Sequence, residues 1–99
     1  MTNYRISDSA ADDLVEIWHH ISQDDPAAAD RMMKRFEAAF MKLGDYPRMG
    51  RGRSRREDEF RVFTVGDYLI FYRLRDNNVD ILRVRSGFLD LDDLILESE

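Results

Sequence analysis

The sequence predicts one α+β domain over residues 1–99, in which an N-terminal strand and an antiparallel two-helix hairpin pack on a three- to four-stranded, mainly antiparallel sheet. Two observations predict this class. In the first half of the chain apolar residues recur every three or four positions, as on one face of a helix, and in the second half they alternate, as in strands. The length of 99 residues suits a single domain. Because the hairpin and the sheet each have an apolar side, we expect them to bury it against one another.

The first strand is predicted at residues 4–6, and a helix follows over residues 9–22. Ser7 suits the N-cap of that helix, since its side chain can accept a hydrogen bond from a free backbone N–H of the first turn. One face of the helix is apolar, and we expect its tryptophan to pack in the core between the two helices: Ala10, Leu14, Ile17, Trp18 and Ile21. The opposite face carries Asp12, Asp13 and Glu16, which we interpret as a solvated acidic surface.

The second helix is predicted from Pro26 to about Leu43. Asp25 can cap it, and proline fits the first helical position because its missing N–H would have no partner there. Gly44 suits the C-terminal stop. The apolar stripe of this helix consists of Ala29, Met32, Met33, Phe36, Phe40 and Leu43.

The period changes after an arginine-rich stretch at residues 48–56, which we predict to be a loop. Strands are then predicted at residues 60–65, 68–75 and 79–84, with turns at 66–67 and 76–78, and residues 90–96 are compatible with a short C-terminal helix. The middle strand is apolar on both faces, as a central strand would be. Tyr68 and Tyr72 lie on one face of it, and we expect them to pack against the helices.

Composition excludes several kinds of site. The chain has no cysteine, which rules out disulfides and thiolate chemistry. His19 and His20 are adjacent on a helix, so their side chains do not converge on one metal ion. We find no spacing typical of a metal site, a phosphate loop or a nucleophile with its base, and we expect no cofactor.

The net charge of −5 and the lack of a membrane-spanning apolar stretch favour a protein of the cytoplasm. An acidic chain lacks the broad basic face on which nucleic-acid affinity usually depends, so direct sequence-specific binding of nucleic acid is not expected. The exception is local: residues 47–61 carry six arginines and three acidic residues.

Four segments, in this order and spacing, resemble the ParE-like branch of the ParE/RelE toxin superfamily from Tyr4 to about Ile95. They read YRISDSAADDLVEIW, DDPAAADRMMKRFEAAFMKLGDYPRMGR, FRVFTVGDYLIFYRL and VDILRVRSG. The resemblance implies the toxin of a bacterial type II toxin–antitoxin system, held in a hetero-oligomer by a cognate ParD-like antitoxin. ParE-type toxins of this superfamily poison DNA gyrase, whereas RelE-type toxins cut messenger RNA on the ribosome.

The chain departs from its relatives at positions that matter for chemistry. ParE-like chains often follow the last strand with a His and then an Arg-Asp pair, where this chain has Ser86, Leu89 and Asp90. RelE-type nucleases also use an Arg on the central strand, where this chain has Leu69. RNA cleavage needs a group that activates the 2′-hydroxyl and cations that stabilise the developing charge. We therefore predict no catalytic residue and a toxin that acts by binding. A RelE-type ribonuclease and a toxin whose activity has decayed remain as alternatives.

Two sets of residues are candidates for binding. Methionines adapt well to binding surfaces, and arginines suit carboxylates and phosphates. The antitoxin-binding set is Trp18, Met32, Met33, Phe36, Phe40, Arg73, Arg83 and Arg85. The apolar members equally suit the core, and the arginines either pair with acids of the helices or form a basic floor for a partner. The target-binding set is Arg51, Arg53, Arg55, Arg56 and Arg61, for which a solvated loop is the alternative.

Overall fold

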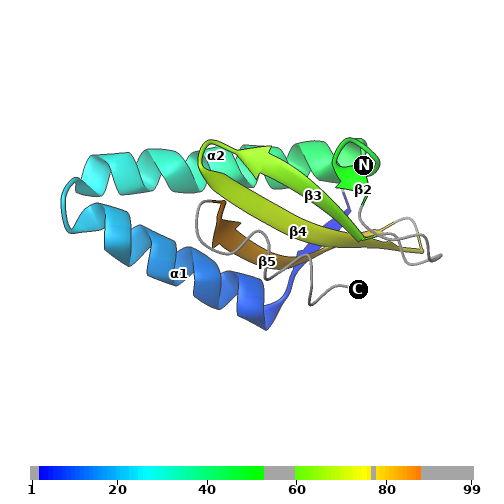
Figure 1. Cartoon of the computed structure of the whole chain (residues 1–99), viewed down its shortest axis with the longest axis horizontal. Coiled ribbons are helices and arrows are strands. Elements are labelled where there is room, and N and C mark those ends of the chain that lie inside the picture. Colours follow the sequence, from blue (N-terminus) through cyan, green and yellow to red (C-terminus); the bar gives the residue numbers. More distant parts are fainter. Residues whose placement is uncertain (1–2, 53–59, 77, 88–99) are drawn as a thin grey trace.

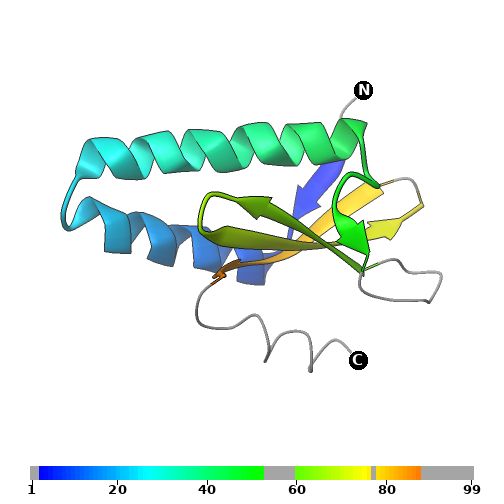
Figure 2. The ribbon, with the colours of Figure 1, turned by 45° about the horizontal axis from the view of Figure 1, so that its top comes forward.

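The structure is a computed structural model that describes residues 3–52, 60–76 and 78–87. Its elements are β1 (Tyr4–Ile6), α1 (Asp8–Ser22), α2 (Pro26–Asp45), β2 (Arg51–Gly52), β3 (Phe60–Val65), β4 (Tyr68–Arg75) and β5 (Asn78–Ser86). The strands form one sheet in the order β1-β5-β4-β3-β2, with β1 parallel to β5 and the other pairs antiparallel. Both helices cover the same face of that sheet (Figures 1 and 2). The predicted α+β class is confirmed.

The helix starts follow the predicted capping residues. The Ser7 side chain accepts a hydrogen bond from the Ala10 N–H at 3.0 Å. Asp25 accepts one from the Ala28 N–H at 3.2 Å, and Pro26 occupies the first turn of α2. These bonds satisfy backbone donors that have no partner inside a helix. Both N-termini are thus positioned by local sequence.

The predicted stop at Gly44 is wrong. The helix α2 continues through Gly44 to Asp45, and the Tyr46 N–H donates to the Lys42 carbonyl at 2.8 Å. A glycine inside a helix costs about 1 kcal/mol relative to alanine. Here Leu43 is fully buried against the sheet, and that packing outweighs the local preference.

The central strands are where the alternation predicted them. The strand β4 lies between β3 and β5, and the two-residue turn before it places Gly66 at a φ of 58°, a conformation that glycine adopts without strain. The strand β5 is longer than predicted and starts at Asn78, where a turn was expected; residue 77 lies outside the described residues.

The sheet has five strands where three to four were predicted, because a short edge strand lies inside the predicted loop 48–56. Arg51 pairs with Val62 and Gly52 with Arg61, which adds β2 to the edge of β3. Residues 53–56 of that loop and the C-terminal helix predicted at 90–96 lie outside the described residues.

The core lies between the helical hairpin and the sheet. The fully buried side chains of largest volume come from α2 and from the helix-facing side of β4 and β5: Phe36, Phe40, Leu43, Ile70, Tyr72, Val79, Ile81 and Val84. Aromatic contacts tie α2 to both halves of the sheet. Phe36 meets Tyr68 of β4 edge to face with ring centroids 5.5 Å apart, and Phe40 meets Tyr4 of β1 at 5.8 Å.

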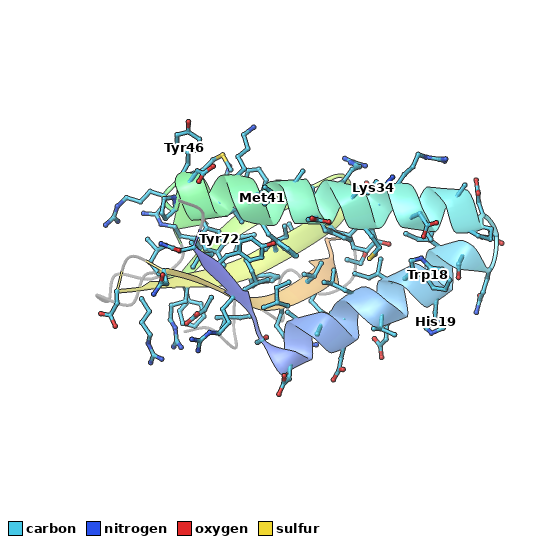
Figure 3. All side chains as sticks on the ribbon, turned by 180° about the vertical axis from the view of Figure 1, so that it is seen from behind. Trp18, His19, Lys34, Met41, Tyr46 and Tyr72 are labelled. Atoms are coloured by element: carbon cyan, nitrogen blue, oxygen red, sulfur yellow. The ribbon has the colours of Figure 1, made fainter. Side chains whose placement is uncertain are left out.

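The closed end of the helical hairpin projects beyond the sheet (Figure 1). Trp18 lies on this projecting part, next to His19 (Figure 3). It is partly buried and outside the core, and its indole Nε1 donates to Asp30 Oδ1 of α2 at 3.0 Å. The prediction that Trp18 packs in the core is therefore wrong, since none of the described strands lies against this stretch of α1. It links the two helices instead.

Candidate functional site

The sheet face turned away from the helices carries a mixture of arginines and apolar side chains, and we call it the outer face. Strand register assigns to it Arg5, Arg51, Phe60, Val62, Thr64, Leu69, Phe71, Arg73, Arg75, Asn78, Asp80, Arg83 and Arg85. A bulge in β5 at Leu82 makes this possible, because the register changes between the pairs Tyr72–Ile81 and Phe71–Arg83. The outer face thus has six arginines and one aspartate among the described residues.

Asp13, in the first half of α1, joins that helix to β5. Its carboxylate accepts a hydrogen bond from the Val84 N–H at 2.9 Å and two from Arg83, at 2.8 Å to Nε and 2.9 Å to Nη2. The strand β1 pairs only with residues 79–81, so beyond that point α1 covers the edge of β5. Asp13 is 7% exposed, and the prediction that it belongs to a solvated acidic surface is wrong.

The three arginines of the predicted antitoxin-binding set therefore differ in the contacts that their side chains make. Arg83 is held by Asp13, which is one of the two alternatives that the sequence left open. Arg73 lies near the Phe60 ring, with its Cζ 6.0 Å from the ring centroid. The Arg73 Nε is buried and has no hydrogen-bond acceptor among the described residues. Arg85 is partly buried and lies opposite Leu69.

A groove of about 360 Å³ runs between α1 and the end of β5. Its lining includes Glu16, His20, Tyr68, Arg85 and Ser86. Burial, helped by the nearby Asp67 carboxylate, raises the pKa of the Tyr68 hydroxyl above its ordinary value of 10.0. The groove thus has polar groups of both charge signs and a phenol that stays protonated at neutral pH.

Most apolar residues of the predicted antitoxin-binding set belong to the core. Met32 is 9% exposed, Phe36 1% and Phe40 2%, so they are not available to a partner while the domain is folded. Met33 is partly buried and packs against the core. The stripe of α2 that faces the sheet is core, because β1, β5 and β3 all contact it, and its part in antitoxin binding stays a prediction.

The exposed apolar side chains of the hairpin are different ones. Met41, in the C-terminal half of α2, is 47% exposed, and Tyr46, the C-cap residue of that helix, is 64% exposed (Figure 3). On α1, Val15 is 56% exposed. Only the three-dimensional packing separates the buried side of α2 from its exposed side.

The predicted target-binding arginines begin in a loop that hydrogen bonds to Tyr72 and Arg61 hold in place. The buried Tyr72 hydroxyl donates to the Pro47 carbonyl and accepts from the Gly50 N–H, each at 2.8 Å. Arg61 donates to the carbonyls of Arg48 at 3.1 Å and Gly50 at 2.7 Å, and so has a structural role.

Only one residue of that set is both described and exposed. Arg51 is exposed on β2, at the end of the anchored loop. The remaining three, Arg53, Arg55 and Arg56, lie outside the described residues. The structure thus fixes where the arginine-rich stretch leaves the sheet.

The two described positions at which the family resemblance leads one to expect an arginine or a histidine carry uncharged side chains in this chain. Leu69 is 8% exposed on β4, and Ser86 ends β5. Leu89 and Asp90 lie outside the described residues. In the described part of the chain no cluster of three or more His, Asp or Glu is suited to hold a metal ion, and neither helix is long and apolar enough to cross a membrane.

Comparison with known proteins gives consistent matches. The profile of the family described as ParE toxin of type II toxin-antitoxin system, parDE, matches residues 4–87. Toxin ParE3 of Caulobacter vibrioides is 31% identical over 80 residues, which cover 80% of this chain and 80% of that relative. A chain from the chromosomal ParDE TA system of P. aeruginosa superposes with a TM-score of 0.70 at 22% identity, covering 87% of this chain and 96% of that chain. At that identity the structural likeness concerns the fold alone.

Proposed function

Because the chain belongs to the ParE toxin family of type II toxin–antitoxin systems, we propose that it poisons DNA gyrase by binding and is neutralised in a complex with a ParD-like antitoxin. The observation that carries the proposal is the family match over residues 4–87, which includes every described helix and strand. We place this activity in the cytoplasm, where gyrase and its DNA are found.

The side chains at the relevant positions support binding over catalysis. A ribonuclease must activate a 2′-hydroxyl and stabilise a negatively charged transition state. Leu69 stands where RelE-type enzymes use an arginine, and a buried leucine provides neither function. The arginines of the outer face remain suited to carboxylates and phosphates.

Inducible expression of this chain without antitoxin tests the function. We expect growth arrest accompanied by double-strand DNA breaks that depend on gyrase. The control is a host with a gyrase variant resistant to other poisons, in which the breaks should fall. Arrest without breaks would contradict the proposal.

A ribosome-dependent ribonuclease is the second candidate, because six outer-face arginines could hold RNA phosphates. It predicts cleaved messenger RNA within minutes of induction and no gyrase-dependent breaks. Leu69→Arg restores the missing cation. If the chain is a ribonuclease, this variant should cleave more messenger RNA than the parent does. If the chain is a gyrase poison, neither the variant nor the parent should cleave RNA. Absence of arrest from a folded, abundant protein would instead indicate a toxin that has lost its activity.

For the antitoxin we propose a contact on the exposed side of α2, which replaces the buried stripe. An apolar helix of the partner would cover Met41, in the C-terminal half of α2, and Tyr46, the C-cap residue of that helix, both of which are exposed. The double variant Met41→Ala with Tyr46→Ala should weaken the complex at least tenfold, measured by calorimetric titration with the purified antitoxin. Lys34→Ala, an exposed change earlier on the same helix, is the matched control. Equal affinity of the double variant and the control would rule out this placement.

A further inference from the structure

One part of the β3 edge has no strand beside it among the described residues. The strand β2 pairs only with Arg61 and Val62, in the first half of β3 (Figure 2). If β2 began earlier in the chain, the same register would place Met49 opposite Thr64. The Met49 N–H donates instead to the Tyr46 carbonyl at 3.0 Å, so Met49 belongs to a turn. In the described part of the chain, Thr64 therefore has no strand partner on that side.

The backbone of Thr64 directs its polar groups toward this open edge. Val65 and Tyr68 flank the two-residue turn between β3 and β4, and such a pair exchanges both of its hydrogen bonds. The next pair of an antiparallel ladder exchanges none, so the N–H and C=O of Thr64 point away from β4. The Val62 carbonyl agrees with this direction, since a Cβ atom on Gly50 would lie 2.9 Å from it. Thr64 is exposed, and unpaired groups on an exposed edge can accept an added strand.

A hollow of about 410 Å³ lies next to this open edge. Its lining includes three apolar residues, Met49, Val62 and Leu69, and two exposed polar residues, Arg51 and Thr64. Unlike the groove between α1 and β5, it is lined by no acidic residue. Arg51 makes no ion pair with any residue that the structure describes. Apolar walls beside one uncompensated cation fit an aliphatic group that carries a negative charge.

The end of β2 limits what can occupy this edge. A strand that runs antiparallel to β3 and pairs with Thr64 would, two residues on, reach the position opposite Val62, which Arg51 already occupies. The added strand must therefore end before that position. If its last residue lies opposite Thr64, its N–H donates to the Thr64 carbonyl and its terminal carboxylate accepts from the Thr64 N–H. Its side chain then lies on the same face as Thr64 and Arg51, about 7 Å from Arg51 along the strand direction, a distance that an arginine side chain spans.

We propose that the open edge of β3 binds the C-terminus of a partner chain that ends in an aliphatic residue. The last residue pairs with Thr64, and its carboxylate binds Arg51. Its side chain fills the hollow beside Val62 and Leu69. The hydrogen bonds of the Tyr72 hydroxyl hold the loop before β2 and so fix one wall of the site. The site is separate from the exposed side of α2, and the inference does not rest on the proposed gyrase target.

Titration of the full-length, isotope-labelled chain with a short peptide tests the site. The probe is an acetylated hexapeptide of threonine and valine that ends in leucine with a free carboxylate. We expect saturable NMR shifts at the amides of Arg51 and Thr64 and at the methyl groups of Leu69, with slower hydrogen exchange of the Thr64 amide. Amidation of the peptide terminus should weaken binding about tenfold, because a hydrogen bond to a charged group is lost. Absence of saturable binding, equal affinity of the two peptides, or shifts centred on another surface would overturn the proposal.

Arg51→Ala separates the carboxylate contact from general charge attraction. It should weaken binding of the free-acid peptide about tenfold and leave binding of the amidated peptide unchanged. Arg5→Ala removes an exposed arginine on β1, at the opposite edge of the sheet, and as the matched control should change neither affinity.

Two further peptides test the strand pairing without any change in the protein. N-methylation of the terminal leucine removes the N–H that donates to the Thr64 carbonyl, so binding should weaken several-fold. Unchanged affinity would contradict the pairing with β3. An amidated peptide with an internal aspartate should bind more weakly than the free acid. If it binds equally well, the site takes an internal acidic segment and the assignment to a chain terminus is wrong.

Discussion

The two faces of the sheet are built from the same strands but serve different purposes. On the helix-facing side, Ile70, Tyr72 and Val84 have at most 1% exposure. On the outer face, the alternate residues of the same strands are arginines around a few apolar side chains. A strand presents its side chains alternately, so a single helical hairpin can seal only one face. The difference teaches that the packing that stabilises the fold is concentrated on the helix-facing side, whereas the other side carries most of its charged residues.

The largest expected effect comes from truncating a buried side chain between the helices and the sheet. Phe36→Ala should lower the free energy of unfolding by about 3–5 kcal/mol, because the side chain is 1% exposed and its removal leaves a cavity. Phe71→Ala on the outer face should cost only about 1–2 kcal/mol, since that side chain is partly exposed. Urea unfolding followed by circular dichroism measures both. Equal losses would mean that the two faces contribute alike.

Removing the carboxylate at the edge of β5 should have the second-largest effect. Asp13→Ala leaves the buried Val84 N–H without its acceptor and should cost about 2 kcal/mol. The Arg83 side chain is 40% exposed, so its lost ion pair adds little. The neighbouring exposed Asp12→Ala is the matched control and should change stability by less than about 0.5 kcal/mol. A loss for Asp12→Ala as large as that for Asp13→Ala would contradict the role assigned to the edge contact.

A smaller effect is expected at the anchored loop before β2. In Gly50→Ala the new Cβ would clash with the Tyr72 hydroxyl and lie 2.9 Å from the Val62 carbonyl, so the loop must shift, at a cost of about 1–2 kcal/mol. Gly52→Ala has open space, with its nearest neighbour, the Arg61 Nη1, at 4.0 Å. Thermal unfolding of the two variants compares them. The anchoring account fails if Gly52→Ala is the more damaging change.

The smallest effect concerns pH. The pKa of Tyr68 is raised in the folded chain, chiefly by burial and further by Asp67. The contribution of the Tyr68 hydroxyl to stability is therefore fully present below pH 10. It is lost as pH rises through the folded pKa, because the unfolded chain loses this proton at a lower pH than the folded chain does. Tyr68→Phe should lose less stability above pH 10 than the parent does, and Tyr46→Phe, which alters an exposed phenol, should behave like the parent. Denaturant unfolding between pH 8 and 11 gives the comparison.

Several features could be predicted because their causes are local. Ser7 and Asp25 cap their helices through bonds within three residues, and the Gly66–Asp67 turn joins strands that alternate visibly. The family resemblance from the four quoted segments is confirmed by the profile match over residues 4–87. The arrangement of Arg83 and Arg85 on one face followed from their spacing.

The candidate site was predicted less well because burial depends on distant parts of the chain. The apolar stripe of α2 identified Phe36 and Phe40 as candidates for core or partner contact. It did not show whether either side chain is accessible to a partner. Asp13 resembled its exposed neighbours in sequence, and only contact with Val84, 71 residues away, makes it a buried acceptor. Trp18 fitted the core stripe, yet the hairpin extends past the sheet at that point (Figure 3).

The sequence by itself determined the helices with their N-terminal caps, the central strands and the family. These depend on periodicity, on capping bonds within a few residues and on composition. Only the tertiary structure decided the added edge strand β2, the continuation of α2 through Gly44, the Asp13–Arg83 contact and the division of the sheet into a sealed and an outer face. Each of these depends on which segments far apart in the chain come to lie together, and that information is not local to any one stretch of sequence.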